Sequence, residues 1–279
     1  MANWLELKLD PAEAMLLKKA VRAISQVAFT DVDYPDEWFT IPNTAAHLCF
    51  TPRFMALVSG LSHNDHPEIL TFLHMPSYIM RRLDCDESRA VIFPLHILLK
   101  QLELNTEFSL SLYGDDFVDD GIRYELENDE GIIIHSSTLP VTEFEGQVDL
   151  SVLDLSQYPM SIGLSSDLFV RVIHELELYG STIRAVVSEN EVVFLVVNHE
   201  LRFQREPGRC EIQSDANEYP FVLKFDLQHK SAFLNAAVLS EMVWIRKTTE
   251  NLTVLDCPID HLGNLLFKFL MMDDEVYPI

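Results

Sequence analysis

The chain has 279 residues, of which 48% are hydrophobic, and its 44 Asp and Glu against 20 Lys and Arg give a formal net charge of −24. This composition excludes an intrinsically disordered chain, which lacks the apolar surface needed to offset the entropy of ordering, and a generally basic nucleic-acid binder, because the overall field repels phosphate. The length suits one large domain or two domains of about 100–150 residues.

The ends of the chain and its cysteines predict a soluble protein without a targeting segment. Acidic residues interrupt the first fifteen positions, where a signal peptide needs an apolar core, and no run reaches the roughly 18 apolar residues of a membrane helix. The cysteines are far apart and form no C-x-x-C pair, so neither a zinc site nor a redox pair is expected. Isolated thiols suit a reducing cytoplasm or nucleus. The four cysteines are Cys49, Cys85, Cys210 and Cys257.

Apolar residues at intervals of three and four predict four amphipathic helices. They are Pro11–Gln26, Pro94–Leu104, Ser166–Tyr179 and Gln228–Leu239. Asp10 is the expected N-cap of the first helix, and Pro11 occupies the first helical position, which proline favours.

Twelve segments between these helices alternate or are rich in β-branched residues, and turn residues bound them, which predicts strands. They are Phe54–Val58, Ile69–Leu73, Ala90–Phe93, Phe108–Tyr113, Gly131–Ser136, Ile183–Val187, Val192–Val197, Leu201–Gln204, Phe221–Phe225, Met242–Arg246, Leu252–Asp256 and Asn264–Leu270. A helix followed by a group of strands therefore occurs four times. This order favours a module duplicated twice, two modules per domain, with largely antiparallel sheets.

A segment near the middle of the chain, Leu139–Gln157, contains four acidic residues and no basic one. It also contains apolar side chains that should lie on another part of the protein. We interpret it as a connector between two domains.

The scarce cations are concentrated on the predicted helices. They are Lys18, Lys19 and Arg22 on the first helix, Lys100 on the second, Arg171 with His174 on the third, and Lys230 on the fourth. Any amphipathic helix has a solvated charged face, so each helix alone indicates little. If the four helices line one surface, however, these residues form a positive stripe on a negative body.

Four stretches of the chain resemble one known family in the same order. Cys85-Asp86 is followed by an apolar strand and by Lys100 in PLHILLKQL, and Phe54–Leu73 precedes this motif as strand, turn and strand. Tyr158–Val197 has a strand, a helix with an outward Arg and two strands, and Phe225–Met272 ends in LLFKFLMM before DDE. Together they resemble the DNA sliding clamps of the PCNA (proliferating cell nuclear antigen) type.

The resemblance implies an α+β fold of two similar domains, each with two short helices on a mostly antiparallel sheet, assembled into a ring with the helices inside. The implied domains are residues 1–138 and 158–279, joined by the connector 139–157. The implied function is that of a processivity factor, which encircles double-stranded DNA independently of its sequence and tethers DNA polymerase and other replication and repair proteins. The implied partners are three copies of the chain per ring, duplex DNA, a polymerase, other clamp-binding peptides and a clamp loader, in the nucleus or at a site of viral DNA replication.

The resemblance also implies roles for single residues. The residues facing DNA would be Lys18, Lys19, Arg22, Lys100, Arg171, His174 and Lys230, with His174 the one expected to be neutral. The subunit interface would contain Ile132, Ile133, Ile134, Leu201 and Phe203, although both strands can equally be ordinary internal strands. A pocket for partner peptides would contain Leu61, Val152, Leu153, Phe269, Leu270, Met271 and Met272. The alternative is plain core packing, which we favour for Leu270 alone, whereas we favour the pocket for the connector residues.

Three features depart from the family pattern. Thr30–Ala46 is interpreted as an insertion, Asp84 stands where the family tends to be basic, and Met271 replaces a proline that often follows the final strand. They favour a diverged clamp, such as a viral one, or one subunit of the related heteromeric checkpoint clamp, which acts mainly as a protein scaffold.

An enzymatic function is the remaining alternative. His63, His66 and His74 lie near Asp65 and suggest a metal-dependent hydrolase, but a turn rich in His and Asp is usually solvated. The segment GDDFVDDG lacks the spaced ligands of a calcium loop, and the phosphate-loop, nucleophile-elbow and H-E-x-x-H motifs are absent from the sequence. We therefore predict that the chain is not an enzyme and has neither a metal nor a cofactor.

Overall fold

The structure, a computed structural model, describes residues 4–28, 45–60, 69–85, 88–103, 108–114, 121–154, 158–214 and 219–270. Within these ranges it is an α+β protein with four α-helices and three sheets, in which every strand pairing is antiparallel. The predicted fold class is confirmed at this level. No helix in the described ranges is long and apolar enough to cross a membrane.

The four predicted helices are present with slightly different ends. They are α1 (Pro11–Ala28), α2 (Leu95–Glu103), α3 (Ser166–Leu176) and α4 (Lys230–Ala237). The predicted start of α1 is confirmed by a capping box. The backbone N–H of Glu13 donates to Oδ1 of Asp10 at 2.9 Å, and the backbone N–H of Asp10 donates to Oε2 of Glu13 at 2.8 Å.

The three sheets contain five, ten and four strands. The five-stranded sheet has the order β5 (Arg82–Leu83), β1 (Leu5–Leu9), β7 (Ser109–Gly114), β8 (Ile122–Glu127) and β9 (Ile133–Leu139). The ten-stranded sheet has the order β10 (Thr142–Glu143), β6 (Arg89–Pro94), β2 (Ala45–Thr51), β3 (Phe54–Ser59), β4 (Ile69–Pro76), β19 (Gly263–Phe269), β18 (Thr253–Ile259), β17 (Met242–Lys247), β11 (Met160–Ser165) and β15 (Cys210–Ser214). The four-stranded sheet has the order β14 (His199–Gln204), β13 (Glu191–Val196), β12 (Thr182–Val187) and β16 (Phe221–Asp226).

Each of the twelve predicted strands overlaps an observed strand. The amino-acid pattern did not predict β1, β2, β5, β8, β10, β11 and β15. Of the predicted insertion Thr30–Ala46, Ala45 and Ala46 begin β2 and pair with β6, and the rest lies outside the described residues.

The order strand, helix, three strands occurs four times along the chain. The four units are β1-α1-β2-β3-β4, β6-α2-β7-β8-β9, β11-α3-β12-β13-β14 and β16-α4-β17-β18-β19. The sheets repeat as well, because the order β5-β1-β7-β8-β9 recurs as β15-β11-β17-β18-β19, and β6-β2-β3-β4 recurs as β16-β12-β13-β14. The chain therefore contains one arrangement of eleven elements twice.

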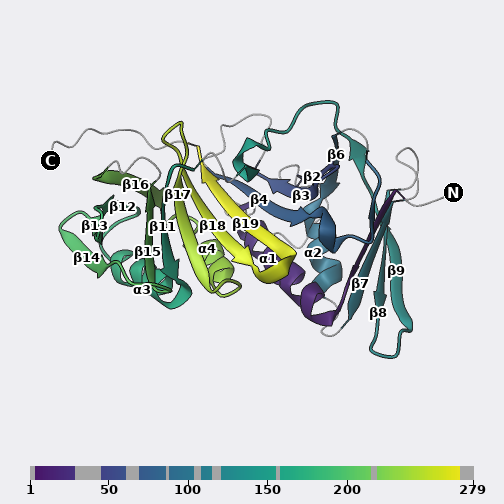
Figure 1. The fold of residues 1–279 in the computed structure, drawn as a ribbon. Coiled ribbons are helices and arrows are strands. Elements are labelled where there is room, and N and C mark those ends of the chain that lie inside the picture. The colour runs from purple at the N-terminus through teal and green to yellow at the C-terminus, as the bar shows by residue number, and fades with distance from the viewer. Residues whose placement is uncertain are drawn as a thin grey trace.

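The two copies of this arrangement join through one strand pair, β4 with β19. The pairing runs from Asn264 opposite His74 to Phe269 opposite Ile69. Gly263, at the start of β19, has φ 129°, and a Cβ there would lie 1.9 Å from the carbonyl oxygen of His74. A side chain cannot be accommodated at this close approach. Along the same junction α1 contacts α4 and α2, and α4 contacts α3, so the helices form a row α3-α4-α1-α2 (Figure 1).

The ten-stranded sheet is apolar on both faces near this junction. The larger hydrophobic cluster lies between its inner face, the helices and the other two sheets. A smaller cluster covers the outer face and includes Val58, Phe72, Val254 and Leu266. Strands buried on both faces read as continuous apolar runs, which is the pattern of β4 and β19.

Candidate functional site

The row of helices brings together all seven residues predicted to face DNA. Six of them are exposed, and Lys18 on α1 is partly buried. The four helices carry six Lys or Arg and four Asp or Glu, a formal charge of +2 in a chain of −24. The helix row is therefore slightly positive while the remainder of the protein is strongly negative.

Acidic residues on α3 and directly after it compensate the positive charges on α3 and α4. Arg171 Nε lies 2.6 Å from Glu175 Oε1, and His174 Nδ1 lies 3.4 Å from Glu177 Oε1. Lys230 forms an ion pair with the same Glu177 and is the main cause that lowers the pKa of this carboxyl. The charges of Arg171 and Lys230 are thus largely balanced locally.

The basic residues on α1 and α2 have fewer acidic partners. Lys19, Arg22 and Lys100 are exposed, and none of them forms an ion pair within the part of the chain that the structure describes. The strongest positive potential of the helix row is therefore expected over α1 and α2.

The two predicted interface strands are both sheet edges. β9 ends the five-stranded sheet and β14 ends the four-stranded sheet, so neither is an internal strand among the described residues. They lie at opposite ends of the elongated molecule (Figure 1). Ile132, Ile133 and Ile134 are 56%, 51% and 46% exposed, respectively. Leu201 and Phe203 are instead half-buried against the chain's own core.

The connector is fixed to the outer face of the ten-stranded sheet. β10 extends this sheet beside β6, and Lys268 Nζ of β19 lies 3.5 Å from Asp149 Oδ2. The Tyr158 hydroxyl donates a hydrogen bond of 2.5 Å to the carbonyl oxygen of Val152, which lies in the short 3-10 helix η3 (Ser151–Leu153). These contacts hold apolar connector side chains on the smaller hydrophobic cluster.

The described residues of the predicted peptide pocket lie on two different faces of the ten-stranded sheet. Val152 is buried in the smaller cluster, and Leu153 and Leu270 pack against it. The placement of Phe269 is wrong: its ring centre lies 6.3 Å from that of Phe225 and 5.8 Å from that of Phe233, in the core on the helix side. Successive strand residues point to opposite faces, so Phe269 and Leu270 cannot share a pocket. Leu61, Met271 and Met272 lie outside the described residues.

The space that remains beneath the connector is small. A cavity of about 30 Å³ lies between Val152, Tyr158, Lys268 and Thr248. A space of this size holds water but not a peptide side chain. Sequence reasoning missed Tyr158; its signal was an aromatic residue followed by proline at the end of the connector.

A buried charged group lies beside this cavity, and sequence reasoning missed it too. Asp256 on β18 is fully buried, with Arg246 Nε 2.9 Å from its Oδ2 and Asn264 Nδ2 2.8 Å from its Oδ1. The guanidinium carbon of Arg246 lies 5.0 Å from the ring centre of Trp244 and 5.9 Å from that of Tyr158. Burial, with a smaller contribution from Asp256, raises the pKa of Tyr158 well above its usual value. The signal was an acidic residue inside an apolar strand.

The enzymatic alternative receives no support from the described residues. His63, His66 and Asp65 lie outside them, as do residues 115–120 of the calcium-like segment. His74 lies on β4 against Phe54, with 5.0 Å between ring centres, and burial lowers its pKa. No group of three or more His, Cys, Asp or Glu with the geometry of a metal site occurs in the ranges that the structure describes.

None of the four cysteines forms a disulfide, and all four are buried. Burial raises the pKa of Cys49 to about 12 and that of Cys210 to about 11. Because the thiolate is the reactive form, these thiols are inert at neutral pH.

Comparison with known proteins adds no assignment, since no protein-family model and no curated protein matches this chain. Function is therefore inferred from the residues and their geometry.

Proposed function

We propose that this chain is a subunit of a ring-shaped sliding clamp, which encircles duplex DNA and tethers DNA polymerase and other replication or repair proteins. The observation that carries the proposal is that the two halves of the chain pair once, through β4 and β19. The equivalent pairing of the two remaining edge strands does not occur within the described residues of one chain. In the duplicated arrangement, β14 corresponds to β4 and β9 corresponds to β19. Within the described ranges the outer edges of β9 and β14 pair with no other strand.

Pairing β9 of one copy with β14 of the next would reproduce the internal junction between copies. Such a contact is head-to-tail, and head-to-tail contacts form rings when the rotation closes. It would also cover two strand edges, one of them apolar, which otherwise invite aggregation. The positions of β9 and β14 at opposite ends of the molecule suit this arrangement (Figure 1).

The internal junction also supplies a register for the contact between copies. Leu265 pairs with Leu73 across the β4–β19 junction. Following the strand pairings of each half, Leu265 corresponds to His135 on β9, and Leu73 corresponds to Leu201 on β14. The proposed register therefore places His135 opposite Leu201 of the neighbouring copy.

The helix row would line the hole of this ring. Lys19, Arg22 and Lys100 would contact phosphates, which gives a salt-dependent hold without sequence specificity. A weak hold suffices, because a closed ring is retained by topology. The acidic remainder of the protein would repel DNA and favour the hole.

Partner peptides would bind beneath the connector, at the cluster of Val152, Leu153 and Leu270. Because the connector's own side chains occupy this surface, binding would require the connector to lift. A polymerase tethered in this way would stay with the DNA that the ring encloses.

The second candidate is a subunit of a heteromeric checkpoint-type clamp that acts mainly as a protein scaffold. The pairing of Arg171, His174 and Lys230 with acids of the same surface favours it, since such a lumen attracts DNA weakly. In that case β9 and β14 would pair with strands of other proteins.

Threading onto DNA tests the proposal. A linear duplex fixed to beads at one end is incubated with the full chain, the free end is then blocked with streptavidin, and the beads are washed at high salt. A homomeric ring has about three times the 32.0 kDa of one chain by light scattering, and the blocked duplex retains it while the open duplex does not. A monomer that both duplexes lose contradicts the homomeric clamp and favours the scaffold. Equal retention on both duplexes would show a DNA-gripping protein instead.

A further inference from the structure

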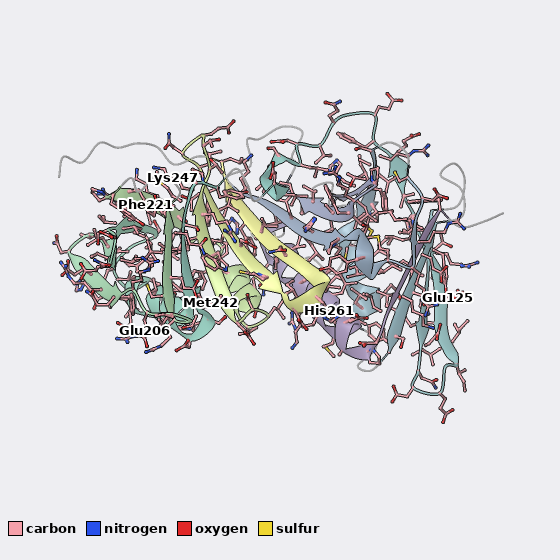
Figure 2. All side chains as sticks on the ribbon, in the orientation of Figure 1. Glu125, Glu206, Phe221, Met242, Lys247 and His261 are labelled. Carbon is pink, nitrogen blue, oxygen red and sulfur yellow. The ribbon has the colours of Figure 1, made fainter. Side chains whose placement is uncertain are left out.

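A cavity of about 270 Å³ adjoins the β14 edge, and its walls are basic. Arg171 of α3, Arg202 of β14 and Arg209 of the turn before β15 line it, together with Glu206 and the apolar side chain of Leu168. Figure 2 shows Glu206 at the lower left end of the molecule. Three arginines at one hollow are notable in a chain of −24.

The present partners of these arginines are carboxylates, and all are exposed except Glu191, which is half-buried and lies 3.2 Å from Arg202. Arg171 pairs with Glu175 at 2.6 Å, Arg202 with Glu200 at 2.9 Å, and Arg209 with Glu206 at 3.4 Å. The three arginine side chains remain 56%, 54% and 53% exposed, respectively. Ion pairs at such exposure contribute little and exchange readily for better-placed carboxylates.

A rigid acidic turn lies at the other end of the molecule, between β8 and β9. Asp129 and Glu130 at its tip are exposed. The Asn128 side chain accepts hydrogen bonds from the backbone N–H groups of Glu130 at 3.1 Å and Ile132 at 2.9 Å. The tip is therefore held in one conformation, which reduces the entropy cost of its binding.

The internal junction shows where this turn would lie in a ring. There the corresponding connection, η5 (Asp260–Leu262) between β18 and β19, contacts the first turn of α1, and His261 Nε2 lies 2.6 Å from Glu13 Oε1. Glu13 is the third residue of α1, and the third residue of α3 is Leu168, which lines the arginine cavity. The β8–β9 turn lies at the lower right of Figure 1, and Glu206, which lines the cavity, lies at the lower left of Figure 2 in the same orientation.

We infer that the arginine cavity is the docking site for the β8–β9 turn of a second copy of this chain, with Asp129 and Glu130 facing Arg171, Arg202 and Arg209. The inference rests on the proposed ring and adds an electrostatic contact to its strand pairing. The contact would take the place of the His261–Glu13 pair, with the acidic side chains on the turn and the basic ones beside the helix. It allows one direction of assembly and opposes contacts between two identical ends, because those would bring like charges together.

Charge exchange tests the inference on the full chain. One variant carries Asp129→Lys and Glu130→Lys, a second carries Arg202→Glu and Arg209→Glu, and a third combines all four changes. The matched controls are Glu189→Lys, in the exposed β12–β13 turn, and Arg205→Glu, an exposed neighbour that does not line the cavity. Self-association is measured by sedimentation, and circular dichroism checks the fold of each variant.

Each of the first two variants is expected to weaken self-association about tenfold or more, the third to recover most of that affinity, and the controls to match the wild type. Reversed variants that assemble like the wild type would overturn the turn-to-cavity contact and leave the ring intact. A wild-type chain that stays monomeric would overturn both the contact and the homomeric ring.

Discussion

The buried ion pair beneath the connector shows how one polar contact is maintained inside an apolar sheet face. Asp256 is fully buried, and the Arg246 side chain is 14% exposed. Removing one partner of such a pair lowers the free energy of unfolding by more than the intact pair adds to it, because the remaining buried charge has no partner.

Replacing Arg246 with Met should therefore lower the free energy of unfolding by about 3 kcal/mol, as expected for a buried charge deprived of its partner. Asn264 would still donate to the carboxylate but carries no charge. Urea denaturation measures this decrease. In the double variant R246M/D256N most of the stability should return, and a double variant as unstable as R246M would show that altered packing, not the charge, is responsible.

His261 connects the two halves of the chain through Glu13, and this contact should make stability depend on pH. The Glu13 carboxylate, with a smaller contribution from Asp260, raises the pKa of His261 above its usual value. A group with a raised pKa in the folded state stabilises fully below its unfolded pKa of about 6.5 and loses this effect as pH rises through the folded value.

Thermal denaturation of His261→Gln should consequently show a lower melting temperature than the wild type at pH 6, and nearly the same one at pH 9. The corresponding difference in the free energy of unfolding should stay below about 1 kcal/mol, because the His261 side chain is half exposed and solvent screens the pair. A difference that does not change with pH would mean that the imidazole acts through packing alone.

The connector is the element whose mobility the proposed peptide binding requires. Its most specific anchor is the hydrogen bond from the Tyr158 hydroxyl to the Val152 carbonyl. Tyr158→Phe removes this bond, which is worth about 1 kcal/mol, and keeps the ring in the hydrophobic cluster. Amide hydrogen exchange of residues 148–153 should become several-fold faster, with β9 unchanged as the internal control. Equal exchange in both proteins would mean that apolar packing alone holds the connector.

The edge strands allow a direct test of the register proposed between copies. The pair His135→Cys and Leu201→Cys, in one chain, should form disulfide-linked oligomers under mild oxidation, because residues opposite each other in an antiparallel pair lie within disulfide reach. The four natural cysteines are buried and should not compete. The shifted pair Ser136→Cys and Leu201→Cys is the control, since those side chains point to opposite faces. Equal cross-linking of both pairs would contradict the register.

The distribution of charge over the whole molecule determines how firmly the proposed ring holds DNA. Lys19, Arg22 and Lys100 form no ion pair among the described residues, whereas Arg171 and Lys230 are already paired. Reversal of the first three to Glu should abolish stimulation of a polymerase and flatten the salt dependence of DNA binding, by about 0.9 log units of affinity per log unit of salt for each phosphate that the protein no longer neutralises.

The single variant Lys230→Glu is the comparison and should have a clearly smaller effect per charge, because Lys230 is paired with Glu177. Light scattering should show unchanged assembly in both variants. If the effect per charge is the same in both, the pairing with Glu177 does not weaken this cation, and the DNA-facing surface extends to α4.

Much of the fold could be predicted because its signals are local. The four helices follow from apolar spacing, and the start of α1 follows from Asp10, Pro11 and Glu13, which are close in sequence. Strands such as β8 and β15 were missed because charged and polar residues interrupt their apolar pattern. They form strands because neighbouring strands supply their hydrogen bonds.

The candidate site depends on contacts between residues distant in sequence, and the amino-acid pattern by itself determined only part of it. It established the excess of acids, the cations on the helices and the apolar strand before the connector. The face to which Phe269 points, the free edges of β9 and β14, and the meeting of Arg171, Arg202 and Arg209 at one cavity emerged only from the folded chain. Strand register and sheet order set these features, and both depend on which distant segments bury their apolar faces together.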